Sequence, residues 1–143
     1  MRKQPFSITV DRAFRKVMEA CAAPSTGRDT TWITPEFVEA YTKLNQEGHA
    51  HSIECWHQNE LVGGIYGVAV GGLFAAESMF HRVSNASKVA LCTLVDRLRE
   101  RSFKLLDVQM VTPATEPLGA IAIPRAEYLR RLKKAIDHEF SFI

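Results

Sequence analysis

The chain has 143 residues, of which 18 are Lys or Arg and 16 are Asp or Glu, so its formal charge is +2. This length fits one domain, and a content of 46% hydrophobic and 24% charged residues is typical of an average soluble globular chain. No apolar run approaches the roughly 20 residues of a membrane span, and no signal-peptide pattern opens the sequence. The three cysteines form no CxxC pair and are too few for a disulfide framework, which favours a cytoplasmic location.

The first third of the sequence predicts one strand and two helices. Alternating apolar and polar residues predict a strand over 6–10. Asp11 is placed to cap a following helix, whose apolar residues recur at helical spacing over 13–21. A second helix is expected from its cap Thr34, which precedes a proline and a glutamate, to a stop at Gly48.

The middle of the sequence predicts three strands and a helix. The strand-like segments are 50–56, 61–70 and 73–80. Their short connections favour an antiparallel meander. Residues 85–101 then have the apolar spacing of a helix.

The remaining segments complete a mixed α/β (α+β) architecture. Residues 104–109 predict a strand, 111–119 a loop with prolines, 124–136 a helix, and 140–143 a final short strand. The order β-α-α-β-β-β-α-β-α-β gives a mixed sheet flanked by helices. This order is similar to that of the acyl-CoA N-acetyltransferases (the GNAT fold), a likeness that implies no function by itself. Without a repeat or a linker, residues 1–143 are expected to form a single domain.

Two carboxylates interrupt otherwise apolar strands. Glu77 lies near the end of the third meander strand, where burying it without a partner would be costly. Strand alternation places Asp107 and Gln109 on one face, where they could hold a reacting amine or orient a base. The alternatives are an edge charge paired with Arg82 for Glu77, and the outer face of an amphipathic strand for the other two.

A run of odd-numbered residues raises the question of a zinc site. His49, His51, Cys55 and His57 would share one face of a strand. At ~3.3 Å per residue, however, the first and last lie about 26 Å apart, and no further CxxC or HxxxH supplies ligands. No metal site is therefore expected. Cys92 lies on the apolar face of its helix and is interpreted as a core residue.

Charged and capping residues offer two weaker signals. Ser84 or Asn85 would cap the helix at 85–101, whose first turn suits an anion, although every capped helix shares this property. Basic residues also gather near both ends of the chain, where they would form a patch if the ends adjoin. Ordinary solvated helix faces explain these clusters nearly as well. They are Arg2, Lys3, Arg12, Arg15 and Lys16, and Arg125, Arg130, Arg131, Lys133 and Lys134.

Seven ordered motifs, taken together, are more specific than any one of them. They are TWITP (31–35), HAHSIE (49–54), ELVGGIYGV (60–68), ESMF (77–80), NASK (85–88), DVQ (107–109) and LGA (118–120), the last followed by IPR (123–125). The series runs from about Pro5 to Leu132 and resembles the leucyl/phenylalanyl-tRNA–protein transferases.

The resemblance implies an aminoacyltransferase with an acetyltransferase-like core. Such enzymes move Leu or Phe from aminoacyl-tRNA to the α-amino group of proteins that begin with Arg or Lys, which marks these proteins for bacterial N-end-rule degradation. The reaction is aminolysis of an ester, so the amine must lose a proton and the oxyanion needs donors. The ester already carries the activation, so no cofactor or metal is expected, and no membrane partner. An apolar pocket distinguishes one methylene by only about 1–3 kcal/mol, which makes Met a further expected donor.

The resemblance also implies roles for individual residues. Asp107 and Gln109 match the family's Asp-x-Gln, which would position and activate the amine, and Glu77 matches a glutamate that contacts the aminoacyl moiety. The positions lining the family's apolar pocket hold Ile65, Met79 and Leu106. The position suited to stacking on the terminal adenosine holds Trp32, and the basic pair that grips the tRNA acceptor stem is Arg2 and Lys3.

The sequence departs from the family pattern at two points. The family carries a further N-terminal domain, which is expected to be absent here. Ala114 and Pro117 stand where a His and a Ser are commoner, which would remove a polar contact near the amine.

Two other functions stay open. A CoA-dependent N-acyltransferase would need a glycine-bearing pyrophosphate loop, and residues 81–86 contain no glycine. A non-catalytic module would bind tRNA or a protein N-terminus without turnover.

Overall fold

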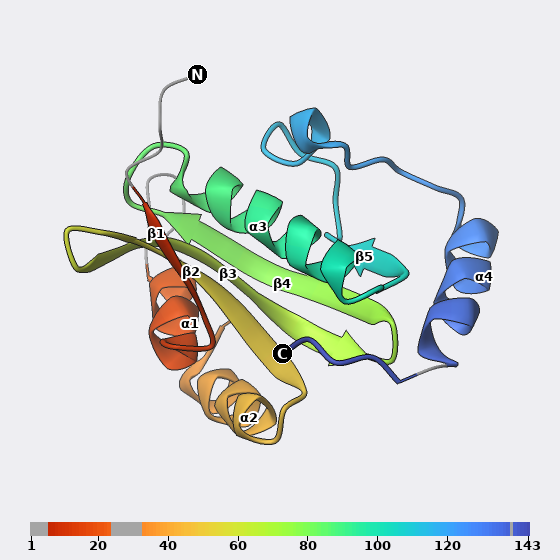
Figure 1. Ribbon diagram of the computed structural model, residues 1–143, viewed down its shortest axis with the longest axis horizontal. Helices are drawn as coiled ribbons and strands as arrows, with labels where there is room; N and C mark the ends of the chain where they lie inside the picture. The colour runs from red at the N-terminus through yellow and green to blue at the C-terminus, as the bar shows by residue number, and fades with distance from the viewer. Residues whose placement is uncertain (1–5, 24–32, 138) are drawn as a thin grey trace.

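The computed structural model describes residues 6–23, 33–137 and 139–143, and its centre is one five-stranded sheet in the order β1-β2-β3-β4-β5 (Figure 1). The strands are β1 (Ser7–Val10), β2 (Ala50–His57), β3 (Glu60–Val70), β4 (Leu73–His81) and β5 (Leu105–Asp107). The first four strands pair antiparallel, whereas β5 runs parallel to β4. The predicted meander and mixed sheet are therefore confirmed.

Helices cover both faces of the sheet (Figure 1). They are α1 (Phe14–Ala22), α2 (Pro35–Gln46), α3 (Ala86–Glu100) and α4 (Arg125–Ile136), with a short 3-10 helix η1 (Glu116–Leu118). α1 and α2 pack around Tyr66 of β3, whereas α3 packs around its neighbour Ile65 on the opposite face. α4 lies beyond β5, and its last turn is attached to the β3–β4 turn, where the Gly72 N–H donates to the Ala135 carbonyl at 2.6 Å. None of the helices in the described part of the chain combines the length and apolarity needed to cross a membrane.

The helix starts follow the sequence signals only in part. Thr34 caps α2 as predicted, because its Oγ1 accepts from the Phe37 N–H at 3.3 Å. The predicted cap of α1 is wrong: the cap position is Ala13, and the Asp11 carboxylate turns toward β2 instead. Asn85 stands at the cap of α3, but in a left-handed conformation and without a side-chain cap hydrogen bond.

A bulge interrupts β4 at Glu77. Tyr66 pairs with Ser78 while the next residue, Gly67, pairs with Ala76, so Glu77 is the extra residue on β4. The backbones approach closely here, and a Cβ on Gly67 would clash with the carbonyl oxygen of Ala75. A glycine in β3 is therefore part of what places the carboxylate of Glu77.

The C-terminal end of the described chain contradicts one prediction. Residues 139–143 form no strand. Phe142 is instead held by side chains, with its ring stacked on His51 at 4.4 Å and on Phe74 at 5.2 Å between centroids. Its carbonyl oxygen accepts from Arg97 Nε at 2.7 Å. An alternating apolar pattern indicates burial here, but the backbone finds its partner in an arginine side chain.

Candidate active site

The two strand carboxylates singled out in the sequence lie close together where β4 and β5 separate. Asp107 is the last residue of β5 and pairs with Ala75, while β4 continues through the bulge at Glu77. Gln109 joins them, because its Nε2 donates to Glu77 Oε2 at 3.1 Å. These three residues are called the Glu77–Asp107–Gln109 cluster below.

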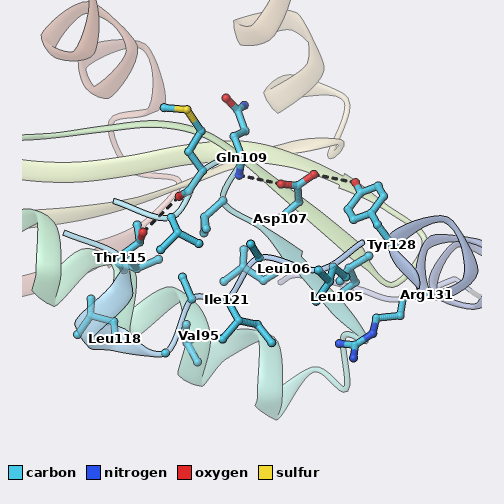
Figure 2. A pocket seen from close by; sticks show the side chains of 18 of the residues that line it. Val95, Leu105, Leu106, Asp107, Gln109, Thr115, Leu118, Ile121, Tyr128 and Arg131 are labelled. Atoms are coloured by element: carbon cyan, nitrogen blue, oxygen red, sulfur yellow. Dashed lines mark hydrogen bonds between the residues drawn. The ribbon is translucent and has the colours of Figure 1, made fainter. Parts of the chain in front are cut away.

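Gln109 reaches this cluster by a turn, which corrects the predicted strand alternation. β5 ends at Asp107, and Gln109 has a left-handed backbone with φ of 70°. Asp107 Oδ1 accepts from the Gln109 backbone N–H at 2.7 Å, which closes an aspartate turn (Figure 2). The two side chains therefore share a site although they do not share a strand face.

A tyrosine on the helix that the sequence predicted over 124–136 completes the contacts of Asp107. The Tyr128 hydroxyl, on α4, donates to Asp107 Oδ2 at 2.7 Å (Figure 2). The two residues are 21 positions apart on different elements, so no local motif signals the pairing. The Asp107 carboxylate thus receives one hydrogen bond on each oxygen.

Burial and neighbouring charges separate the acid–base properties of these groups. Partial burial raises the pKa of Glu77, the negative charge of Asp107 raises it further, and the hydrogen bond from Gln109 opposes both effects. The hydrogen bond to Asp107, together with burial, raises the pKa of Tyr128 to about 12. Near neutral pH the phenol therefore keeps its proton and acts as a donor, while Glu77 takes up a proton more readily than an ordinary glutamate.

A groove of about 820 Å³ includes Asp107 in its lining and lies among α3, β5, the segment 108–123 and α4. Apolar side chains form much of its lining, and Figure 2 labels Val95, Leu106, Leu118 and Ile121 among them. Cys92 also lines this groove and is exposed, so its interpretation as a core residue is wrong. The charged residues of the lining are Asp96, Arg99, Asp107, Arg125 and Arg131.

The three residues that the resemblance places in an apolar pocket share one core cluster. Ile65 is 3% exposed and pairs in register with Met79 of β4, and both Met79 and Leu106 pack against the cluster that contains Ile65. Leu106 also lines the groove. Trp32, Arg2 and Lys3 lie outside the described residues.

The structure also gives the partners of other charged residues considered in the sequence. Arg82 does not pair with Glu77, because its guanidinium lies over the Phe80 ring at 5.7 Å. On α4, Arg131 Nε bonds Glu127 at 2.8 Å, and the hydrogen bonds from Arg130 and Arg131 lower the Glu127 pKa to about 2. Part of the basic character of α4 is therefore neutralised within the helix.

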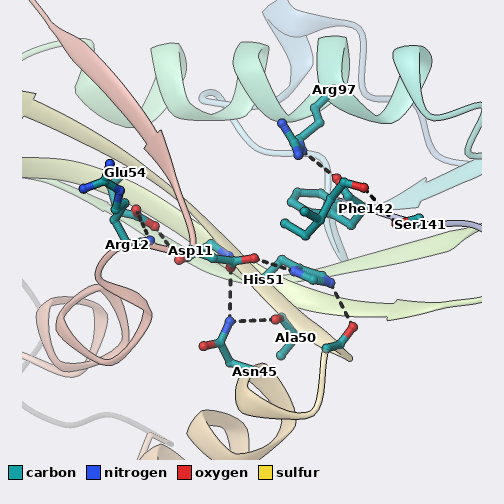
Figure 3. Close-up of polar contacts among 12 residues, drawn as sticks. Asp11, Arg12, Asn45, Ala50, His51, Glu54, Arg97, Ser141 and Phe142 are labelled. Carbon is teal, nitrogen blue, oxygen red and sulfur yellow. Dashed lines mark hydrogen bonds and ion pairs between the residues drawn. The ribbon is translucent and has the colours of Figure 1, made fainter.

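A second group of carboxylates, called the buried Asp11–Glu54 network, lies between β1, β2 and α2. Asp11 accepts from His51 Nδ1 at 2.7 Å, from the Ser52 N–H at 2.8 Å and from Asn45 at 3.1 Å (Figure 3). Glu54 is fully buried, and it accepts from Thr9 Oγ1 at 2.7 Å, the Arg12 N–H at 2.9 Å, and the Ser52 hydroxyl.

This network uses residues that the zinc hypothesis considered. His51 is turned to Asp11 and to the Gly48 carbonyl, and the Cys55 thiol donates to the Ala86 carbonyl at 3.3 Å. Across the described ranges, no three His, Cys, Asp or Glu side chains come close enough to hold a metal ion.

Solved structures with the same architecture include several acetyltransferases. A ribosomal-protein-alanine N-acetyltransferase from Brucella melitensis biovar Abortus 2308 superposes with a TM-score of 0.58 at 14% identity, over 82% of this chain and 92% of the other. A protein from Clostridium acetobutylicum described as a predicted acetyltransferase, solved with acetyl-CoA, gives a TM-score of 0.61 at 9% identity, over 84% and 92% of the two chains. At these identities the likeness shows the fold alone, which confirms the predicted fold class.

Sequence relatives are much closer. A leucyl/phenylalanyl-tRNA–protein transferase from Shewanella woodyi is 48% identical over 137 residues, which are 96% of this chain and 58% of the relative. One from Herpetosiphon aurantiacus is 50% identical over 142 residues, which are 99% of this chain and 72% of the relative. The chain thus spans between about half and three quarters of the length of such relatives. Residues 1–133 match the model of the leucyl/phenylalanyl-tRNA protein transferase family, and with these relatives the match shows that the chain belongs to that family.

Proposed function

We propose that this chain transfers an aminoacyl group from aminoacyl-tRNA to the α-amino group of acceptor proteins. The proposed donors are Leu and Phe esters, with Met as a further donor, and the proposed acceptors begin with Arg or Lys. Membership of the family supports the reaction class. The assignment of this reaction to particular residues rests on one observation, the Glu77–Asp107–Gln109 cluster where β4 and β5 separate.

The chemistry of ester aminolysis matches what this cluster offers. The acceptor nitrogen attacks the ester carbon, loses a proton, and displaces the terminal hydroxyl of the tRNA. With Gln109 Nε2 turned to Glu77, the carbonyl oxygen of the same side chain is left to accept from the incoming amine. Asp107 fixes the Gln109 backbone and adds the negative charge that attracts a cationic amine. We assign the positioning and activation of the acceptor amine to these two residues.

Glu77 is assigned to the donor. The α-ammonium group of an aminoacyl ester needs an anionic or accepting partner, and the Glu77 carboxylate lies beside Gln109 on the β4 bulge. Its raised pKa also suits it to exchange a proton at moderate pH. The aminoacyl ester is already activated, so the proposed reaction calls for no cofactor or metal.

Apolar and tRNA contacts are assigned to two further groups of residues. Ile65, Met79 and Leu106, which share one core cluster, are proposed to enclose the donor side chain. Trp32 is proposed to stack on the terminal adenosine, and Arg2 and Lys3 to contact the acceptor stem, on the strength of the sequence resemblance. We also propose that residues 1–143 act as one catalytic domain.

A transfer assay with the full chain tests this proposal. Leu-, Phe-, Met- and Val-tRNA serve as donors, and peptides that begin with Arg, Lys or Asp serve as acceptors. The expected result is transfer of Leu, Phe and Met to the Arg and Lys peptides, with loss of activity in Glu77→Gln. A lack of transfer from every aminoacyl-tRNA would overturn the proposal, and acetylation of the same peptides from acetyl-CoA would favour the CoA-dependent alternative.

A further inference from the structure

We propose that Tyr128 is a positioning residue that holds the Asp107 carboxylate in its working orientation, an inference that rests on the function proposed for this site. The Tyr128 hydroxyl donates to Asp107 Oδ2 at 2.7 Å, and the Gln109 N–H donates to Oδ1 at the same distance. The two donors come from opposite sides of the carboxylate, one from its own turn and one from α4 (Figure 2).

Asp107 needs an outside partner because of where it lies. It is the last residue of a three-residue strand at the edge of the sheet, and the chain leaves the strand directly after it. The hydrogen bond from Gln109 lies within the same turn, and the turn itself is tied to β4 through the exposed bond from the Gln109 side chain to Glu77. The bond from Tyr128 connects the carboxylate to a separate helix.

α4 is itself attached to the sheet at the β3–β4 turn. The start of α4 follows Pro124, whose carbonyl accepts from the Tyr128 N–H at 3.0 Å. Near its other end, the buried Ala135 accepts from Gly72 at the β3–β4 turn. The end of α4 is therefore held beside the N-terminal end of β4, and the Tyr128 hydroxyl reaches Asp107 at the C-terminal end of β5.

The direction of the bond is defined by the chemistry of the pair. A phenol with a pKa of about 12 keeps its proton across the physiological range, so Tyr128 donates and Asp107 accepts. With both oxygens engaged, the carboxylate plane is fixed, and Gln109 is fixed through it. Removing the hydroxyl would leave Asp107 free to rotate away from the geometry that the amine requires.

The decisive variant is Tyr128→Phe, which deletes one oxygen and keeps the ring. A hydrogen bond to a charged group is strong enough that we expect kcat to fall about tenfold, with KM for aminoacyl-tRNA unchanged. In an Asp107→Asn background the same substitution should change the remaining rate less than about twofold, because the residue it positions is already altered. Glu127→Gln is the matched control, since it breaks the neighbouring ion pairs on α4 without touching Asp107 and should keep the wild-type rate.

A second measurement needs neither activity nor the Phe variant. The titration of Tyr128, followed through its ¹³Cζ resonance, should begin at lower pH in Asp107→Asn than in the wild-type chain, because the accepting carboxylate is gone. An unchanged titration would overturn the inference whether or not the chain transfers amino acids. If the wild-type chain transfers and Tyr128→Phe keeps its kcat, the inference fails while the proposed function stands; if the wild-type chain transfers nothing, the proposed function fails.

Discussion

The Glu77–Asp107–Gln109 cluster and the buried Asp11–Glu54 network are built from the same kinds of groups but differ in how completely their oxygens are enclosed. Glu54 accepts hydrogen bonds from β1, from β2 and from the Arg12 N–H just before α1, and it is fully buried, so no substrate can reach it. Asp107 is partly exposed, and Gln109 is exposed beside a groove. A carboxylate whose partners all belong to the fold stabilises one arrangement, whereas a carboxylate with an open side can act on a ligand.

The largest difference between the two clusters should appear in the transfer rate. Asp107→Asn is expected to lower kcat about 100-fold or more, because it removes the charge that fixes Gln109 and attracts the amine. The melting temperature should stay near that of the wild type, since the site is open to water. The control is Asp137→Asn, an exposed aspartate at the end of α4. A wild-type rate in Asp107→Asn would remove Asp107 from the proposed mechanism.

The next difference should appear in stability. Glu54→Gln places an amide group among donors that need an acceptor, so we expect about 2–3 kcal/mol of destabilisation. Glu77→Gln, on the open side, should cost less than about 1 kcal/mol, because water can satisfy the new amide. Urea unfolding of the two variants measures both values. Equal losses in the two variants would mean that enclosure does not distinguish the clusters.

The glycine beside the β4 bulge provides a test that links stability to the open cluster. Gly67→Ala introduces a Cβ that would clash with the Ala75 carbonyl and the Phe74 ring. We expect about 1–3 kcal/mol of destabilisation, because the strands must shift to accommodate the extra methyl group. The shift would also displace Glu77, so the transfer rate of the folded variant should fall. Retention of full activity in a destabilised variant would show that the bulge does not position Glu77.

The sequence predicted the strands and helices better than it predicted contacts between them. Nine of the ten elements expected from the sequence are present in the structure, and Thr34 marked the start of α2 correctly. The strand expected at 140–143 failed because Phe142 is buried by ring stacking, and its backbone pairs with Arg97. Alternation of apolar residues reports burial, and it cannot tell whether a neighbouring strand exists to pair with.

The candidate site illustrates the same limit. Glu77, Asp107 and Gln109 were visible as polar residues in apolar surroundings, and the structure brings them together. The backbone features that bring them together were not visible in the sequence. The β4 bulge depends on a glycine in β3, and an aspartate turn holds Gln109 where the sequence predicted a strand. Tyr128 was missed because its partner lies on another element.

The smallest expected effect is a difference between the two clusters in how the free energy of unfolding depends on pH. Burial raises the pKa of Glu54, against the hydrogen bonds that it accepts, and burial likewise raises the pKa of Glu77. A carboxyl group with a raised pKa in the folded state disfavours folding once it is charged, so its contribution is most favourable below its ordinary pKa and is lost as the pH rises through the folded value. Glutamine has no such dependence.

The stability deficit of Glu54→Gln relative to the wild type should therefore be larger near pH 4.5, the ordinary pKa of a glutamate, than at pH 7. Glu77→Gln should show the same sign with a smaller change, because its carboxylate is partly hydrated in the folded chain. Urea unfolding of the three proteins at a series of pH values provides the comparison, and taking differences from the wild type removes the contribution of the titrating groups that do not interact with the substituted residue. A Glu54→Gln deficit that grows toward pH 7 would show that the donors around Glu54 outweigh its burial, and the network would then be a site built for the charged carboxylate.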